Sequence, residues 1–288
     1  MEKTQVIPFF DSFTSTYSYV VHSPQQAECA VIDSVLDYEP NAARITTTSA
    51  EKIVKYIEEN NLKLQWILET HAHADHLSAS AWLKEQLGGQ TAIGAPITTV
   101  QSTFKKIYNL GNEVQIDGRP FDQLLNAGER FFIGTIPVDV LHVPGHTPAD
   151  MAYHVHGTGV FVGDTLFQPD VGTARCDFPG GDAKTLYQSI QKIYQFPDDT
   201  VLYMCHDYPP QHRKPSPKST VGAQKRHNIH VREGISEAEF VSVREKRDAT
   251  LAMPRLLLPS LQVNIRAGEL PEPESNQTRY LKIPLNML

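Results

Sequence analysis

Residues 70–76 read THAHADH and place three histidines and an aspartate within seven positions. Side chains at i and i+2 of an extended segment point the same way, so His71 and His73 can contact one ion. Asp75 and His76 begin the next element and can face a second position. Three adjacent imidazoles would repel one another if protonated, whereas neutral imidazole and carboxylate are common ligands of zinc and non-haem iron. The stretch therefore predicts a metal site.

Three other polar residues also come directly after expected strands. They are His146 in PGHTP, Asp164 in VGDT and His206 in CHDY. A lone histidine is more often a packed or solvated side chain than a ligand. Loops at the ends of strands, however, commonly carry functional residues on a rigid scaffold. Together with residues 70–76, these positions predict one centre assembled from distant parts of the chain.

The composition argues against several classes of protein. Hydrophobic residues are 40% and charged residues 20% of the chain, as in an ordinary globular protein. The formal net charge of −7 argues against a nucleic-acid binder, and we find no run of about 20 apolar residues that would span a membrane. The N-terminus lacks the basic-then-apolar order of a signal peptide, and three cysteines make no disulfide framework. We expect a cytoplasmic protein that binds neither nucleic acid nor membrane, and a homo-oligomer is compatible with the sequence.

Strand-like and helix-like segments occur in both halves of the chain. Residues 64–70 form a mostly apolar strand that runs into the histidine cluster, and residues 78–89 favour a helix. Ser236 and Glu239 have the spacing of a capping box, which predicts the start of a last helix. We expect a single domain over residues 1–288, with a C-terminal extension from about residue 221. Alternation along a strand also predicts that Cys205 points away from the metal, into the core.

In their order and spacing, HAHADH, PGHTP, GD and HDY resemble the motifs of the metallo-β-lactamase superfamily, over roughly residues 8–210. This resemblance implies an α/β fold, the αββα sandwich of two mixed β-sheets flanked by helices, with the metal at one edge between the sheets. The superfamily includes hydrolases, nucleases and oxygenases, so the fold leaves the reaction open. Residues 172–190 and 253–271 resemble the persulfide dioxygenase branch. The whole chain is also similar to the bacterial β-lactamase-like hydrolases found with sulfide-responsive regulators.

The dioxygenase resemblance implies one Fe(II) per chain, held by His71, His146 and Asp164. This 2-His-1-carboxylate face leaves three positions for O₂ and substrate sulfur. The other residues of the motifs would orient these ligands, namely His73, Asp75, His76 and His206. The implied reaction is oxidation of glutathione persulfide by O₂ to glutathione and sulfite.

The alternative is a zinc-dependent thioester hydrolase of the glyoxalase II type. In its two-zinc form the same residues divide differently: His71, His73 and His146 hold one ion, Asp75, His76 and His206 hold the other, and Asp164 bridges them. The ligands therefore do not distinguish one iron from one or two zinc ions. A third hypothesis is a sulfide-sensing protein that retains the metal site, and the complete ligand set argues against it.

The resemblance also implies residues that contact the substrate. Tyr208 can donate a hydrogen bond to bound oxygen or sulfur, and Asp75 joins it as a catalytic candidate. Arg175 can bind a carboxylate of glutathione, beside Asp177 and Phe178 of the same segment. The alternatives are a packing role for Tyr208 and, for the further candidate Arg266, an ion pair that anchors the tail. The basic residues within 213–232 indicate either a basic lip at the pocket or a solvated charge run.

Overall fold

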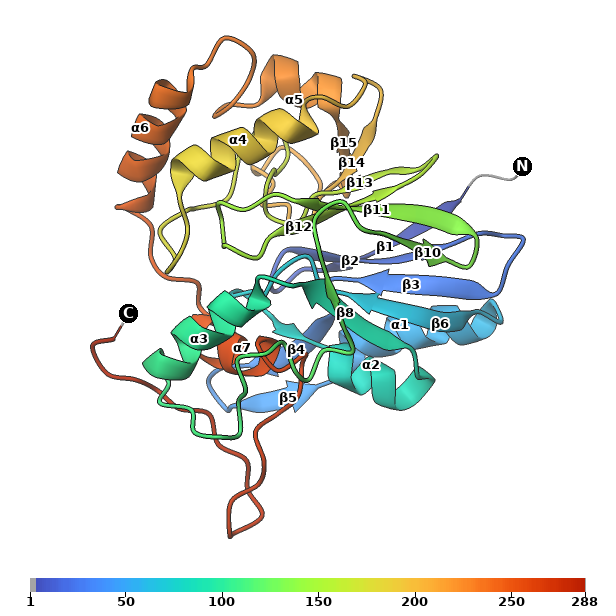
Figure 1. The fold of residues 1–288 in the computed structure, drawn as a ribbon, viewed down its shortest axis with the longest axis vertical. Coiled ribbons are helices and arrows are strands. Elements are labelled where there is room, and N and C mark those ends of the chain that lie inside the picture. Colours follow the sequence, from blue (N-terminus) through green and yellow to red (C-terminus); the bar gives the residue numbers. More distant parts are fainter. Residues whose placement is uncertain (1–3, 288) are drawn as a thin grey trace.

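Two six-stranded sheets lie face to face in the computed structural model, which describes residues 4–287 (Figure 1). The first sheet has the order β1 (Gln5–Asp11), β2 (Thr16–His22), β3 (Glu28–Ile32), β6 (Lys63–Leu68), β8 (Gln90–Gly94) and β9 (Gln123–Leu125). The second has the order β10 (Arg130–Ile133), β11 (Ile136–His142), β12 (Met151–Val155), β13 (Gly159–Phe161), β14 (Val201–Tyr203) and β15 (Lys218–Thr220). A small third sheet contains β5 (Arg44–Thr46), β4 (Val35–Glu39) and β7 (Leu77–Ser78).

Helices cover the outer face of each large sheet, so the predicted αββα sandwich is confirmed (Figure 1). On the side of the first sheet lie α1 (Thr48–Glu59), α2 (Ser80–Leu87), α3 (Ile97–Ile107) and α7 (Leu257–Asn264). On the side of the second sheet lie α4 (Ala183–Ile193), α5 (Val221–His227) and α6 (Glu237–Asp248). No helix within residues 4–287 has the length and apolarity needed to cross a bilayer.

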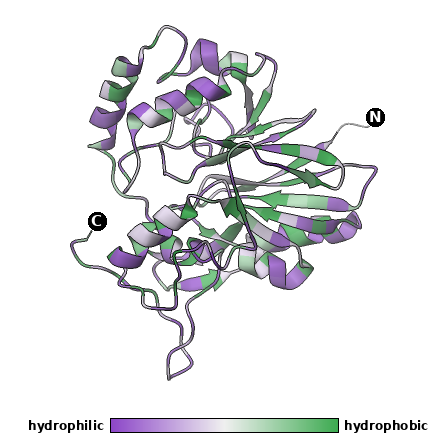
Figure 2. Cartoon of the chain, in the orientation of Figure 1, coloured by the Kyte–Doolittle hydropathy of each residue, from purple (hydrophilic) through white to green (hydrophobic). Residues whose placement is uncertain are grey.

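The main core lies between the two large sheets. Tyr19 and Ile32 of the first sheet and Val138 and Tyr153 of the second belong to one buried cluster. Strand β11 alternates between buried and partly exposed residues, whereas every residue of β2 is buried. Figure 2 shows the same pattern, with apolar strands inside and polar residues on the helices. Burial of each large apolar side chain contributes about 1.5–3 kcal/mol, so the sandwich is a rigid frame for the loops at its edge.

The local predictions hold where the chain pattern is clear. Strand β6 ends at Leu68, just before the histidine cluster, and Ser236 begins α6 with the predicted capping box to Glu239. The prediction that this helix is the last one is wrong, because α7 follows it. Helix α7 is buried on nearly all sides and has no polar face, so its sequence lacks the periodicity that reveals a surface helix. The extension from about residue 221 stays a prediction.

Candidate metal centre

The motif residues meet at one edge between the two large sheets. His71, His73 and His76 follow β6, whereas His146 follows β11 and His206 follows β14. All five imidazoles are buried, as is Asp164, which is 7% exposed after β13. A bridge between Thr16 and His206 joins the two sheets at this edge. The fold thus gathers residues that are up to 135 positions apart, from 71 to 206.

The first ligand group consists of His71, His146 and Asp164, whose ligand atoms all lie within 4.8 Å of one another. Asp164 Oδ2 is 3.8 Å from His71 Nε2 and 3.7 Å from His146 Nε2. These separations are close to those of ligands around one ion. Two imidazoles and a carboxylate form the set that non-haem iron uses. The arrangement therefore contains the predicted 2-His-1-carboxylate group.

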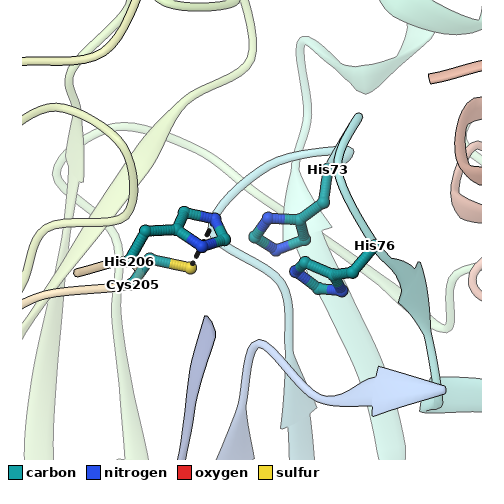
Figure 3. A group of neighbouring side chains, drawn as sticks. All are labelled: His73, His76, Cys205 and His206. Atoms are coloured by element: carbon teal, nitrogen blue, oxygen red, sulfur yellow. Dashed lines mark hydrogen bonds between the residues drawn. The ribbon is translucent and has the colours of Figure 1, made fainter. Parts of the chain in front are cut away.

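The second ligand group consists of His73, His76, Cys205 and His206, with one ligand atom from each within 4.8 Å of the others (Figure 3). Asp75 Oδ2 lies 3.2 Å from His206 Nε2. Asp164 Oδ1 lies 3.4 Å from the same nitrogen, while its other oxygen faces the first group. Asp164 is thus placed between the two groups, as a bridging carboxylate would be.

The hydrogen bonds of the imidazoles fit metal binding. His146 donates from Nδ1 to the Arg175 carbonyl at 2.7 Å, and His76 donates from Nδ1 to the Leu77 carbonyl at 3.1 Å. A protonated nitrogen on one side of the ring leaves the other nitrogen's lone pair for an ion. Four atoms of the centre are among the buried polar atoms without a hydrogen-bond partner: His71 Nε2, His73 Nδ1, His76 Nε2 and Asp164 Oδ1. The residues therefore fit a bound metal.

Two acidic residues that the sequence analysis did not identify contact His73 through the ring nitrogen that faces away from the centre. His73 Nε2 lies 3.0 Å from Asp33 Oδ1 and 3.2 Å from Glu69 Oε2. Asp33 has a φ of 53°, a conformation that costs energy for a residue other than glycine and is common at functional sites. Its position after a strand is the same signal that identified the other residues. These carboxylates fix the ring of His73 so that Nδ1 faces the centre.

Burial and neighbouring charges shift the pKa values of three imidazoles of the site and of the Cys205 thiol. Burial, together with His73, lowers the pKa of His71 well below its ordinary value and that of His76 to about 3. Burial also disfavours protonation of His73, but Asp33 and Glu69 outweigh it and raise its pKa well above the ordinary value. Burial and the carboxylates of Asp33 and Asp164 raise the pKa of the Cys205 thiol. His71 and His76 thus keep a lone pair for a cation, whereas His73 and Cys205 would release a proton on binding one.

A cavity of about 620 Å³ opens beside the centre. Asp75, His146, Asp164 and Tyr208 contribute to its lining, so a bound molecule can reach the first ligand group. The Tyr208 hydroxyl donates to Asp75 Oδ2 at 3.3 Å, and its ring stacks on His206. The volume of this cavity is within the range of sites that bind small molecules.

Among the predicted substrate residues, Arg175 and Phe178 line this cavity. The edge of the Phe178 ring meets His146, with 5.4 Å between centroids. The guanidinium of Arg175 already donates to Asp177 from Nε at 2.5 Å and from Nη2 at 2.7 Å, and to the Ala252 carbonyl from Nη1 at 2.7 Å. Arg175 and Asp177 therefore bind each other. The guanidinium that we expected to bind a substrate carboxylate already has partners within the protein.

Two other arginines of the cavity have freer guanidinium groups. Arg247 has no salt bridge or side-chain hydrogen bond within residues 4–287, whereas its neighbour in the cavity wall, the buried Arg244, pairs with Asp248 at 2.5 Å. Arg255 lies over the Phe13 ring at 3.9 Å and has no carboxylate partner in the same part of the chain. The sequence does not identify either residue, because a basic residue on the polar helix α6 or in the loop before α7 gives no signal of a cavity.

The remaining candidates lie elsewhere. Arg266 is buried outside the lining of this cavity, with Nη2 4.0 Å from Glu113 Oε1, as in the ion-pair alternative. Within the described residues the lining includes none of the basic side chains of 213–232, and Arg213 pairs with Asp207 and Asp170. The predicted orientation of Cys205 is wrong, since its Sγ lies 3.6 Å from His206 Nε2. Strand β14 ends at Tyr203, so the alternation does not continue to this position.

Comparisons with known proteins agree with this architecture. A family model described as the metallo-beta-lactamase superfamily matches residues 11–206. The chain is 50% identical to a probable metallo-hydrolase of Burkholderia pseudomallei, over 97% of this chain and 98% of that protein. It is 49% identical to glyoxylase B2 of Dictyostelium discoideum, over 99% of this chain and 98% of that protein.

More distant similarity extends to the persulfide dioxygenase branch. The chain is 27% identical to the human mitochondrial persulfide dioxygenase ETHE1, over 90% of this chain and 87% of that protein. The crystal structure of ETHE1 from Myxococcus xanthus has a TM-score of 0.74 and 27% identity, covering 92% of this chain and 100% of that chain. The resemblance stated from the motifs is thereby confirmed.

Proposed function

Because the chain belongs to the metallo-β-lactamase superfamily, we propose that it is an iron-dependent persulfide dioxygenase that converts glutathione persulfide, O₂ and water to glutathione, sulfite and two protons. The observation that carries the proposal is the group of His71, His146 and Asp164, which opens onto a cavity. Two imidazoles and one carboxylate leave open positions for O₂ and a sulfur ligand on one ion. Similarity to ETHE1 supports this choice of reaction.

Bound Fe(II) would supply the one-electron steps that let O₂ react with sulfur. The protein orients the reactants. The Arg175 carbonyl accepts a hydrogen bond from His146 and so fixes the angle of that ligand. Tyr208 lies at the cavity wall, where its hydroxyl can donate to an oxygen or sulfur atom of the substrate. Phe178 and Phe167 cover the centre with apolar surface and limit the access of water.

We assign substrate recognition to Arg247 and Arg255 instead of Arg175. Glutathione carries two carboxylates, and guanidinium groups bind carboxylates through paired charge-assisted hydrogen bonds. Both arginines line the cavity, and neither is neutralised by a carboxylate within residues 4–287. Arg175 is bound to Asp177 and the Ala252 carbonyl, so its role is to shape the cavity wall.

The second candidate function is hydrolysis of a glutathione thioester. One observation favours it: Asp164 faces His71 with one oxygen and His206 with the other, as a carboxylate that bridges two ions does. The names of two relatives, a probable metallo-hydrolase and glyoxylase B2, support it as well. In this reaction a metal-activated water attacks a carbonyl carbon, and O₂ has no part.

Oxygen dependence separates the two reactions. Protein purified with iron present and without added zinc should contain one iron per chain. With glutathione persulfide in air, it should consume O₂ and release sulfite, and it should hydrolyse S-lactoylglutathione slowly. Fast thioester hydrolysis under argon, two zinc ions per chain and no persulfide-dependent oxygen uptake would instead establish the hydrolase.

A further inference from the structure

We propose that Cys205 is a thiolate ligand of the second metal position, together with His73, His76 and His206. The metal motifs contain only histidines and aspartates at this centre. The structure adds a sulfur atom to them, because Cys205 belongs to the same four-residue ligand group (Figure 3). The inference concerns the metal and not the reaction, so it holds for an oxygenase and for a hydrolase.

The position of the sulfur fits coordination. A tetrahedral zinc with Zn–S of about 2.3 Å and Zn–N of about 2.0 Å holds its sulfur and nitrogen ligands about 3.5 Å apart. Cys205 Sγ lies 3.6 Å from His206 Nε2. The four ligand atoms all lie within 4.8 Å of one another, so small side-chain movements would close them around an ion. Cys205 is 2% exposed, so its sulfur does not face solvent.

Two other members of the group point to a ligand independently of the cysteine. His73 Nδ1 and His76 Nε2 are buried and have no hydrogen-bond partner. A buried polar atom without a partner costs about 1–3 kcal/mol, so it indicates a group that the bare protein lacks. The far nitrogens of both rings are held by Asp33 and by the Leu77 carbonyl. Each ring therefore keeps one nitrogen for a cation, and one ligand atom of each ring lies within 4.8 Å of the sulfur.

The sulfur makes the two ligand groups chemically different. The first group has only imidazole and carboxylate ligands, which suit iron. A thiolate makes the second group softer, and soft ligands favour zinc over iron. Binding releases the thiol proton to solvent as the sulfur–metal bond forms, since a coordinated thiol is deprotonated. We therefore expect zinc to prefer the second position, while iron occupies the first.

Cobalt reports thiolate coordination directly, because a sulfur-to-cobalt charge-transfer band appears in the near ultraviolet only when a thiolate binds Co(II). The metal-free full-length chain is titrated with CoCl₂ until the visible d–d bands of bound cobalt stop growing. We expect the charge-transfer band in the wild-type chain and its loss in Cys205→Ser. The matched controls are Cys29→Ser and Cys176→Ser, because both thiols are buried but neither belongs to a ligand group among the described residues. Both controls should keep the band.

Zinc X-ray absorption on the wild-type chain gives a test that needs no variant. We expect a sulfur scatterer at about 2.3 Å from zinc, beside the nitrogen and oxygen scatterers. Visible d–d bands without a charge-transfer band in the wild type would overturn the proposal, whether the chain holds one cobalt or two. Retention of the band in Cys205→Ser, or zinc without a sulfur scatterer, would overturn it as well.

Discussion

Asp164 and Asp75 both lie at the metal centre, but they contact different numbers of ligands. Asp164 lies within 4.0 Å of His71, His146 and His206. Among the imidazoles of residues 4–287, Asp75 lies within this distance of His206 only, and it accepts a hydrogen bond from Tyr208. Asp164 is also the only carboxylate of the first ligand group. The two carboxylates should therefore differ in their importance for iron.

We predict that Asp164→Ala abolishes persulfide-dependent oxygen uptake and iron binding. Asp75→Ala is the matched control. Its persulfide-dependent oxygen uptake should fall only about 10–100-fold, as is typical when a residue that orients ligands is removed. Oxygen-electrode rates and iron content of the two purified variants make the comparison. Equal losses in both variants would contradict the assignment of iron to the first ligand group.

Arg247 and Arg175 differ in the partners they have before any substrate arrives. For Arg247→Ala we predict a KM for glutathione persulfide about tenfold higher or more, because a hydrogen bond to a charged group contributes about 1.5–3 kcal/mol. Iron content and the unfolding temperature should not change. Arg175→Ala should instead lower the unfolding temperature, since its contacts with Asp177 and Ala252 are internal. A higher KM for glutathione persulfide in Arg175→Ala, without a change in Arg247→Ala, would show that Arg175 binds the substrate carboxylate.

At the scale of elements, helix α6 holds the segment that carries Arg175. Asp248 accepts hydrogen bonds from Arg244 Nε at 2.9 Å and from the Cys176 backbone N–H at 2.8 Å. Arg244 and Asp248 are 2% and 5% exposed, so neither charge has water as an alternative partner. The cavity wall thus depends on a pair that lies one helical turn apart on α6.

We predict that Asp248→Ala lowers the free energy of unfolding by about 3–5 kcal/mol, because the buried Arg244 guanidinium loses its carboxylate partner and keeps only Thr173. Glu245→Ala, on the exposed side of the same helix, is the control and should change stability little. Urea unfolding followed by circular dichroism measures both. A similar small effect for both variants would show that α6 does not anchor the cavity wall.

The segment between α5 and α6 adds a pH-dependent contact. The Thr173 backbone N–H donates to His230 Nδ1 at 3.1 Å, which requires a neutral ring. Burial, with Arg244 and Arg247 nearby, lowers the pKa of His230 from 6.5 to about 4. The folded chain therefore binds fewer protons than the unfolded chain between these values, and its stability falls as pH decreases from about 6.5 toward 4.

We predict that the wild-type chain loses more stability between pH 7 and pH 5 than His230→Gln does. The difference between the two chains isolates His230, because all other titrating groups are shared. Unfolding temperatures at the two pH values provide the measurement. Parallel losses in both chains would mean that His230 does not titrate in this range.

At the scale of the whole molecule, the centre joins the two sheets. His71, His73 and His76 come from the first sheet, whereas His146, Asp164 and His206 come from the second. An ion bound to both sets binds the folded chain and not the separated segments. We predict that EDTA lowers the unfolding temperature and that Fe(II) or Zn(II) restores it. The increase in unfolding temperature on metal addition should be smaller in Asp164→Ala. An increase equal to that of the wild type would contradict a ligand role for Asp164.

The grouping of the candidate metal ligands and the two-sheet sandwich could be predicted from the sequence. His71, His146, Asp164 and His206 each follow a strand, and imidazole and carboxylate have few reasons to gather except a cation. These signals are local, because residue type and short spacing determine them. The helical spacing of α4 and the capping box of α6 are local in the same sense.

The partners of individual side chains depended on tertiary structure. The sequence placed Arg175 in a substrate role, but Asp177 and the Ala252 carbonyl, 77 residues away, occupy its donors. Arg247 reaches the cavity only because α6 packs beside it. Cys205 faces the ligands because its strand ends two residues earlier, where alternation stops. Which atoms meet is decided by packing between distant elements, and neither residue type nor short spacing encodes that packing.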